Sequence, residues 1–235
     1  MEEKRLLESA LDVLRSSGAQ GDAFLEHRRS LHLNVREGRL EEISRAEVIG
    51  LGLRAIKDGR LGFVHTTALD PDGVTRAAQK AVSLSTAASP REDLLLADAA
   101  AGPGDGADEG ASLGLYDASL ETKPLSEKED WARAAESLAR GYDPRIKRTD
   151  GANYNEDLAG CWIANTKGLF RHHRRSTLNV SVSVIAEDQG EMQPGEADFE
   201  AVRWADLPDP GALGRKAGER AVRLLVLLPH CQKDV

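Results

Sequence analysis

Hydrophobic residues recur with two different periods along this chain, and the two periods predict helices and strands. At residues 6–14, leucine and alanine follow helical spacing, and Gly18 stands where a helix commonly ends. From residue 31 the period changes to two, so that Leu31, Leu33 and Val35 share one face of a predicted strand. The chain therefore opens with a helix that is followed by an extended segment.

Turn residues then mark where the chain reverses and where it enters a second helix. Residues 49–55 and 61–65 alternate on either side of Asp58-Gly59, a strong short hairpin signal. Asp70-Pro71 predicts an N-cap followed by proline in the first turn, which opens a helix through residues 74–82.

The second half of the chain repeats this order. Ser126 and Glu129 have the spacing of a capping box, which predicts the start of a helix that ends near Gly141. Alternation returns at residues 159–163 and 178–184, with a turn at residues 165–168 between them, and a last helix is expected from about Pro210.

The two halves are separated by an Ala-, Gly- and Asp-rich stretch without periodicity. We predict a first α+β unit at residues 1–96, a flexible linker at 97–112, a second α+β unit at 113–228 and a tail at 229–235. Each half has the order helix, antiparallel strands, helix. The predicted fold class is therefore α+β, with two successive helix–antiparallel sheet–helix units.

Composition excludes several classes of protein. The chain has 235 residues, 40% of them hydrophobic, so it is neither collagen-like nor wholly disordered, and its two cysteines are too few for a disulfide framework. A net charge of −8 and a pI near 5.3 argue against a nucleic-acid clamp. We expect no signal peptide and no membrane span, and hence a cytoplasmic protein.

Motifs that carry chemistry are weak in this sequence. Gly50-Leu51-Gly52-Leu53-Arg54-Ala55 matches a dinucleotide-binding pattern but lies inside an alternating strand, so we interpret its glycines as strand glycines. The adjacent His172 and His173 would point to opposite faces, and no H-E-x-x-H or C-x-x-C occurs. We interpret His65 as a core-edge histidine and Cys161 as a small buried hydrophobe, and we assign no catalytic, cofactor-binding or metal-binding residue.

The densest cluster of basic residues spans residues 171–175, which we call the basic segment. On a strand its side chains divide between two faces, which favours a solvated hairpin edge over a nucleic-acid patch. The functional interpretation is a polar sheet edge or cleft wall that accepts an extended peptide by β-augmentation. Its candidate peptide or partner contacts are Arg171, His172, Arg174 and Arg175.

Several ordered segments together resemble one known family. They are NVREGRLE at 34–41, GLGLR at 50–54, DGRLGF at 58–63, LYD at 115–117, NTKG at 165–168 and SVIAED at 183–188, with Gly190 and Met192 just beyond. Their order and spacing across about residues 20–225 resemble the TldD/PmbA family. SVIAED and YDPRI at 142–146 resemble its PmbA (TldE) branch.

This resemblance carries functional expectations. The family was once described as modulators of DNA gyrase and is now described as a two-subunit zinc metallopeptidase of the cytoplasm. The resemblance implies an N-terminal layer beside a chamber for unfolded peptides. The family's H-E-x-x-x-H motif lies in the C-terminal region of TldD-type subunits and does not occur in this sequence. No cofactor is therefore expected in this chain, and zinc is expected only in a TldD-type partner.

Three hypotheses follow, and they leave open whether the chain is itself an enzyme. The first is an incomplete PmbA/TldE-like chain, the substrate-chamber and dimerisation part of a metallopeptidase, which pairs with a TldD-like subunit or with itself. Its substrate would be an extended peptide, with nucleic acid disfavoured and no membrane partner. The second is a regulatory binding module that acts on DNA gyrase or nucleic acid. The third is a truncated, non-functional remnant, since the sequence after residue 225 departs from the family pattern.

Overall fold

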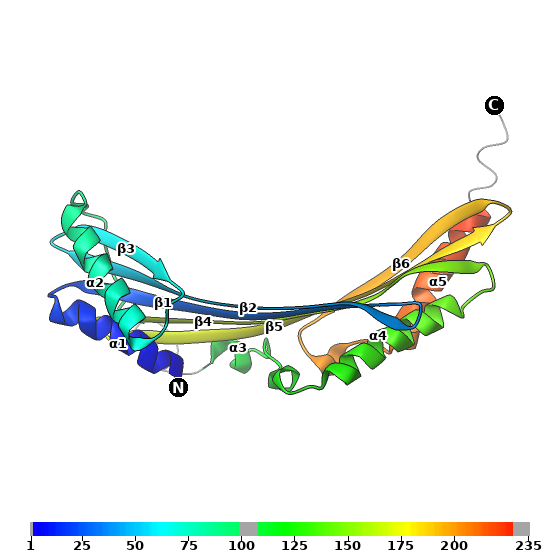
Figure 1. Cartoon of the computed structure of the whole chain (residues 1–235), viewed down its shortest axis with the longest axis horizontal. Helices are drawn as coiled ribbons and strands as arrows, with labels where there is room; N and C mark the ends of the chain where they lie inside the picture. The colour runs from blue at the N-terminus through cyan, green and yellow to red at the C-terminus, as the bar shows by residue number, and fades with distance from the viewer. Residues whose placement is uncertain (1, 99–107, 228–235) are drawn as a thin grey trace, which may run out of the picture. The chain divides into compact units, whose positions relative to one another are not determined.

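The computed structural model describes residues 2–98 and 108–227 and has an α+β fold (Figure 1). Its strands form a six-stranded sheet in the order β3-β2-β1-β4-β5-β6. The strands are β1 (Gln20–Arg36), β2 (Arg39–Lys57), β3 (Arg60–Thr66), β4 (Ile146–Asn165), β5 (Phe170–Asp188) and β6 (Glu191–Ala201). The helices are α1 (Glu2–Ser16), α2 (Pro71–Ala87), α3 (Glu109–Ser112), α4 (Leu125–Arg140) and α5 (Pro210–Leu227), with 3-10 turns η1 (Ala118–Glu121) and η2 (Trp204–Asp206).

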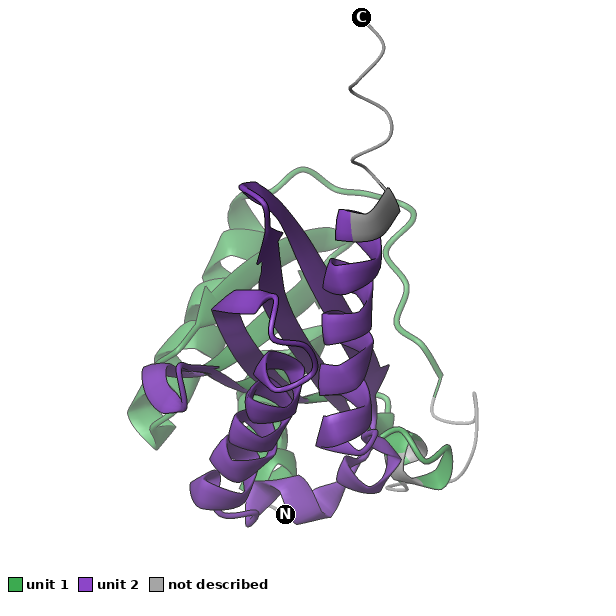
Figure 2. Ribbon diagram, turned by 90° about the vertical axis from the view of Figure 1, so that its right-hand side faces the viewer, with its two compact units in different colours: residues 1–29, 47–115, 159–175 green, residues 30–46, 116–158, 176–235 purple. Residues whose placement is uncertain are grey.

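The chain forms two compact units, each assembled from three separate stretches of sequence (Figure 2). Unit 1 contains residues 1–29, 47–115 and 159–175, and unit 2 contains residues 30–46, 116–158 and 176–235. Four of the strands, β1, β2, β4 and β5, therefore contribute residues to both units. These units are defined by contacts between residues, and the sequence boundaries given above stay a prediction.

Unit 1 has a core in which α1 and α2 pack against strands. Leu7, Leu11 and Leu14 of α1 are buried with Leu51 and Leu53 of β2. The approach of α2 to β3 is close, because a Cβ added to the glycine at position 62 would lie 1.9 Å from a backbone carbonyl oxygen of α2. The predicted periodicity of the first helix is thus confirmed as a buried face.

Two predicted helix boundaries in unit 1 are confirmed. Gly18 follows α1 with φ of 68°, and the Ala19 N–H donates to the carbonyl oxygen of Leu14 at 3.0 Å. An α-helix commonly ends in this way, with a glycine in the left-handed conformation. Asp70 is the N-cap of α2 and accepts the Gly73 N–H at 2.9 Å.

The predicted capping box of the third helix is wrong. Helix α4 begins at Leu125 with Pro124 at the N-cap position and no side-chain cap hydrogen bond. The proline holds φ at −56°, so the helix starts one residue before Ser126. Ser126 consequently lies in the first turn, where its hydroxyl cannot act as the cap.

The predicted hairpin turn at Asp58-Gly59 is confirmed by backbone geometry, and a second turn of the same kind joins β1 to β2. Asp58 and Gly59 both have positive φ, 50° and 67°, and β2 pairs with β3 in antiparallel register beside this turn. Glu37 and Gly38 between β1 and β2 have φ of 51° and 72°. Both pairs have the conformation that a two-residue I′ turn requires. The Gly-x-Gly pattern at 50–52 lies within β2, as the strand interpretation predicts.

The predicted linker lies largely outside the described residues, which omit 99–107, and so does the predicted tail at 229–235. Within the linker range, Glu109–Ser112 forms α3 and Asp108 makes an isolated bridge to His172. No helix in the described part of the chain is long and apolar enough to cross a membrane.

Unit 2 has a core between its strands and two helices on one face. Figure 2 shows the helices of this unit on the same side of its strands. Helices α4 and α5 contribute Trp131, Ala135, Leu213 and Ala217, which pack against alternate residues of β1, β4, β5 and β6. The buried residues of the strands include Leu33, Val35, Ala152, Tyr154, Val180, Val182 and Ala197.

An ion pair closes the turn between α4 and β4. Asp143 accepts two bonds from the Arg145 guanidinium at 2.9 Å each and the Arg145 N–H at 2.9 Å. These bonds from Arg145 lower the pKa of Asp143 from 3.8 to about 2. The folded state therefore prefers the ionised carboxylate more than the unfolded chain does.

Removing this carboxylate should change the acid dependence of stability. Because the pKa is depressed on folding, its stabilising effect is complete above about pH 4 and disappears as the pH falls towards 2. The difference in unfolding free energy between wild type and Asp143→Asn should follow that course, measured by urea unfolding at pH 2 to 7. A difference that stays constant over this range would contradict the assignment.

Candidate functional site

The predicted contact residues of the basic segment lie at the start of β5, within unit 1. Arg174 donates its main-chain N–H to Oδ1 of Asp108 at 3.1 Å and its Nε to Oδ2 at 2.6 Å. Arg171 donates to the carbonyl oxygen of Phe170 at 2.9 Å, and Arg175 is exposed. Two of the three arginines are thus engaged within the chain.

His172 lies in an aromatic cluster. Its ring stacks on Trp162 with centroids 6.4 Å apart and planes 5° from parallel, and it lies 6.0 Å from the Phe170 ring. Its Nε2 is 3.9 Å from a carboxylate oxygen of Asp108, and its buried Nδ1 has no hydrogen-bond partner. The segment is therefore no continuous basic patch, and its role as a peptide or partner contact stays a prediction.

The outer edge of β5 at this segment already contacts the same chain. Strand β6 pairs with β5 only from Leu178 to Asp188, so it does not cover residues 170–177. Asp108 bridges to His172, and a Cβ added to Gly110 would lie 1.7 Å from the carbonyl oxygen of Arg174. An extended peptide would have to displace this contact to pair with β5 here.

Unit 2 carries a second candidate, a polar sheet face opposite its helices. Side chains alternate between the faces of a strand, so the neighbours of the buried strand residues point away from the core. We call this surface the amide face. It consists of Ser30, His32 and Asn34 of β1, Asn153, Asn155 and Asp157 of β4, and Asn179 and Ser181 of β5.

Hydrogen bonds run across the strands of the amide face. From β1 to β4, Ser30 donates to Asp157 at 2.5 Å and Asn34 donates to Asn153 at 2.8 Å. His32 Nδ1 lies 2.6 Å from Asn155 Oδ1. From β4 to β5, the Asn153 amide donates to Ser181 Oγ at 3.3 Å and the Asn155 amide to Asn179 Oδ1 at 3.4 Å. These bonds align the side chains in rows and hold them over the sheet.

The sequence pattern alone does not single out the amide face. The available signal was the alternation of polar and apolar residues in SLHLNV at 30–35 and the asparagines at 153 and 155. Such alternation is typical of any strand with one solvated face, so it did not single out a site.

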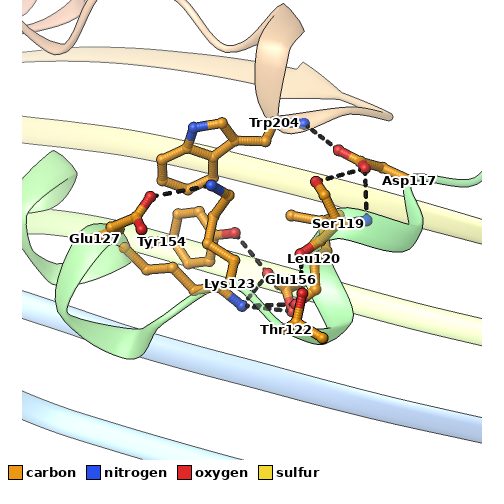
Figure 3. A network of polar contacts seen from close by, with 10 residues as sticks. Asp117, Ser119, Leu120, Thr122, Lys123, Glu127, Tyr154, Glu156 and Trp204 are labelled. Carbon is orange, nitrogen blue, oxygen red and sulfur yellow. Dashed lines mark hydrogen bonds and ion pairs between the residues drawn. The ribbon is translucent and has the colours of Figure 1, made fainter.

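Beneath the amide face, on the core side of β4, lies a buried charged network (Figure 3). Lys128 Nζ lies 2.6 Å from Glu156 Oε2 and also donates to the Leu120 carbonyl oxygen at 3.4 Å. The Tyr154 hydroxyl donates to Glu156 at 2.6 Å, and burial raises the pKa of Tyr154. Because Lys128 and Glu156 are 5% and 7% exposed, this network is structural, and it fixes β4 against α4 and η1.

The remaining candidate residues do not assemble a site. Cys161 is partly exposed in β4 and so is not the buried residue predicted, and His65 is exposed in β3 rather than at the edge of the core. In both cases the side chain lies on the strand face that the core does not cover. Among the described residues, no group of three or more His, Cys, Asp or Glu side chains is placed to hold a metal ion.

Comparison with known families finds two matches, one in each half of the chain. Residues 21–85 match the family described as PmbA/TldA metallopeptidase domain 1, and residues 118–225 match the PmbA/TldA metallopeptidase central domain. The chain is 25% identical over 227 residues to the metalloprotease PmbA of Escherichia coli O157:H7. The aligned region covers 95% of this chain and 49% of that protein.

Solved structures share the fold. A candidate modulator of a DNA gyrase from Thermotoga maritima has a TM-score of 0.75 at 20% identity over 93% of this chain and 47% of its own. A similar protein from Bacteroides thetaiotaomicron has a TM-score of 0.74 at 22% sequence identity, over 94% of this chain and 50% of its own. TldE from Thermococcus kodakarensis has a TM-score of 0.67 at 16% sequence identity, over 94% of this chain and 47% of its own. The chain spans about half the length of these relatives.

Proposed function

Because this chain belongs to the PmbA/TldD metallopeptidase family, we propose that it is the substrate-chamber and dimerisation part of a PmbA/TldE-like subunit. In this proposal the chain provides walls and contacts for unfolded peptides in the cytoplasm. A TldD-type partner provides the zinc ion and the groups that break the peptide bond.

The amide face is the observation that carries this proposal. It offers a surface made mainly of amide and hydroxyl side chains, whose neighbours in the strands are buried under α4 and α5. Asparagine and serine side chains both donate and accept hydrogen bonds, so they can pair with the main chain of an extended peptide whatever its sequence. Such a wall suits a protease that handles unfolded chains of many sequences.

The zinc ion belongs to the partner in this proposal. When bound there, it would polarise a water molecule for attack on the peptide bond. The described residues of this chain hold no group of metal ligands that would take part, so their proposed work is to bind and orient the peptide.

The purified chain tests this proposal in two measurements. Alone, it should hydrolyse no unfolded peptide, for example reduced casein fragments, and metal analysis should find no stoichiometric zinc. Mixed with the TldD-type protein of the same organism, it should elute as a complex in size-exclusion chromatography. One tightly held zinc ion per chain, or elution of the two proteins apart, would overturn it.

A regulatory role on DNA gyrase is the alternative that the names of two solved relatives raise. Binding to nucleic acid would depend on phosphate contacts, which give a steep loss of affinity with salt. Submicromolar DNA binding that weakens steeply between about 50 and 200 mM salt, measured by fluorescence anisotropy, would favour this alternative over the chamber role.

A further inference from the structure

The hydrogen bonds within the amide face use part of its donors and leave one buried acceptor unpaired. The amide N–H groups of Asn34, Asn153 and Asn155 donate to neighbouring strands, and the Ser30 hydroxyl donates to Asp157. In these bonds Asn34 and Asn153 each use one of the two N–H groups of the amide. Asn34 Oδ1, in contrast, is a buried acceptor without a hydrogen-bond partner. A buried acceptor without a donor costs free energy.

Strand β6 extends the same face with carboxylates. The register pairs Asn179 with Glu200, Ser181 with Asp198 and Ser183 with Glu196. Directly paired residues of antiparallel strands lie on the same side of the sheet, so the three carboxylates continue the rows of the amide face. All three residues are exposed.

These carboxylates are available to a ligand. Within the described residues, no Lys, Arg or His side chain forms an ion pair with Glu196, Asp198 or Glu200. Arg220 approaches this strand but donates to the main-chain carbonyl oxygen of Glu196, at 2.6 Å. With Asp157, the β4–β6 side of the face carries four carboxylates, which complement a cationic partner.

The spacing of the carboxylates matches one kind of partner. They stand at every second residue of a strand, so they are about 6.5–7 Å apart along it. An extended peptide has the same repeat, and it presents every second side chain to one side. Lysine or arginine at alternate positions would therefore meet successive carboxylates, while main-chain N–H groups face the acceptors of the amide face.

We propose that the amide face and the carboxylates of β6 together bind extended, basic polypeptide segments with Lys or Arg at alternate positions. This inference rests on the proposed function and names the substrate class that the chamber wall prefers. It assigns the amide face to the peptide main chain and Glu196, Asp198 and Glu200 to the basic side chains.

Fluorescein-labelled twelve-residue peptides test the proposal by anisotropy on the full chain. The probe alternates lysine and serine, and its controls alternate glutamine with serine or place all the lysines in one block. The variant Glu196→Gln/Asp198→Asn/Glu200→Gln should bind the alternating lysine peptide about tenfold more weakly, since three exposed ion pairs that each contribute modestly are lost together. Circular dichroism should show an unchanged fold, because all three side chains are exposed.

A matched control changes the same number of charges elsewhere. Glu8→Gln/Asp130→Asn/Glu219→Gln alters exposed helical residues and should leave the affinity within about twofold, because these residues belong to helices and not to the amide face or β6. Equal losses in both variants would show a net-charge effect and overturn the proposal. So would equal binding of the block and alternating peptides.

The outcomes separate this inference from the proposed function. If the glutamine peptide binds as well as the lysine peptide, the preference for basic segments is wrong while the chamber role stands. If the β6 variant changes the oligomeric state in light scattering and leaves peptide affinity unchanged, the face binds a second copy and the inference is overturned. Failure to form a complex with a TldD-type protein would contradict the proposed function alone.

Discussion

Lys128→Met is expected to lower the free energy of unfolding by about 3–5 kcal/mol, the largest effect we foresee from a single substitution. The substitution keeps the length of the side chain but removes its charge. Glu156 would then be a buried carboxylate, 7% exposed, whose remaining partner is the hydroxyl of Tyr154. An unpaired buried charge is far more costly than the pair that it replaces.

Two further variants distinguish loss of the ion pair from loss of packing. Glu156→Gln alone leaves Lys128 charged and unpaired, so it should also destabilise the protein. The double variant Lys128→Met/Glu156→Gln has no buried charge, and glutamine still accepts the Tyr154 hydroxyl, so it should be more stable than either single variant.

Urea unfolding followed by tryptophan fluorescence measures these effects, because Trp131 and Trp204 both belong to unit 2. Lys80→Met is the matched control, since Lys80 is exposed on α2, and it should change the unfolding free energy by less than about 0.5 kcal/mol. A double variant less stable than both single variants would show that the pair is not the source of the effect.

The second large effect is expected for Glu136→Ala, at about 3 kcal/mol. Glu136 lies in α4, is 1% exposed, and accepts the N–H groups of Glu37 and Gly38 at 2.6 and 2.7 Å. These are the two left-handed residues of the β1–β2 turn. The substitution leaves both N–H groups without an acceptor, and each hydrogen bond to a charged group is worth about 1.5–3 kcal/mol.

A control in the same helix isolates this effect. Glu127 has a 52% exposed side chain and pairs with Lys123, so Glu127→Ala should cost at most about 1 kcal/mol in the same urea experiment. Glu136→Gln should fall between wild type and Glu136→Ala, because the glutamine amide accepts one N–H and opposes the other. Equal stability of the alanine variants at 127 and 136 would contradict the role assigned to Glu136.

Local signals predicted the elements well because each depends on neighbours in sequence. The Asp58-Gly59 turn, the N-cap at Asp70 and the end of α1 at Gly18 each rest on conformations available to a few residues. The capping box predicted at Ser126 was wrong for the same kind of reason, since Pro124, two residues earlier, is the N-cap residue of α4. A stronger local constraint overrode a weaker one.

Features of the candidate site depend on residues far apart in sequence. The amide face joins Ser30 to Asp157, and the support of the β1–β2 turn joins Glu37 to Glu136. The engagement of the basic segment depends on Asp108, 66 residues before Arg174. No spacing rule connects such positions, so the sequence identified the basic segment and missed the face.

The sequence by itself predicted four helices, β1 to β5, their turns and the family, because these follow from periodicity, from turn chemistry and from ordered segments, but it did not predict β6. Only the tertiary structure decided which polar residues of β1, β4, β5 and β6 lie in one row. Strand register controls that choice, since a shift of one residue would bury the amides and expose the core. Register is set by the pairing of whole strands, and it therefore becomes visible only when the sheet is assembled.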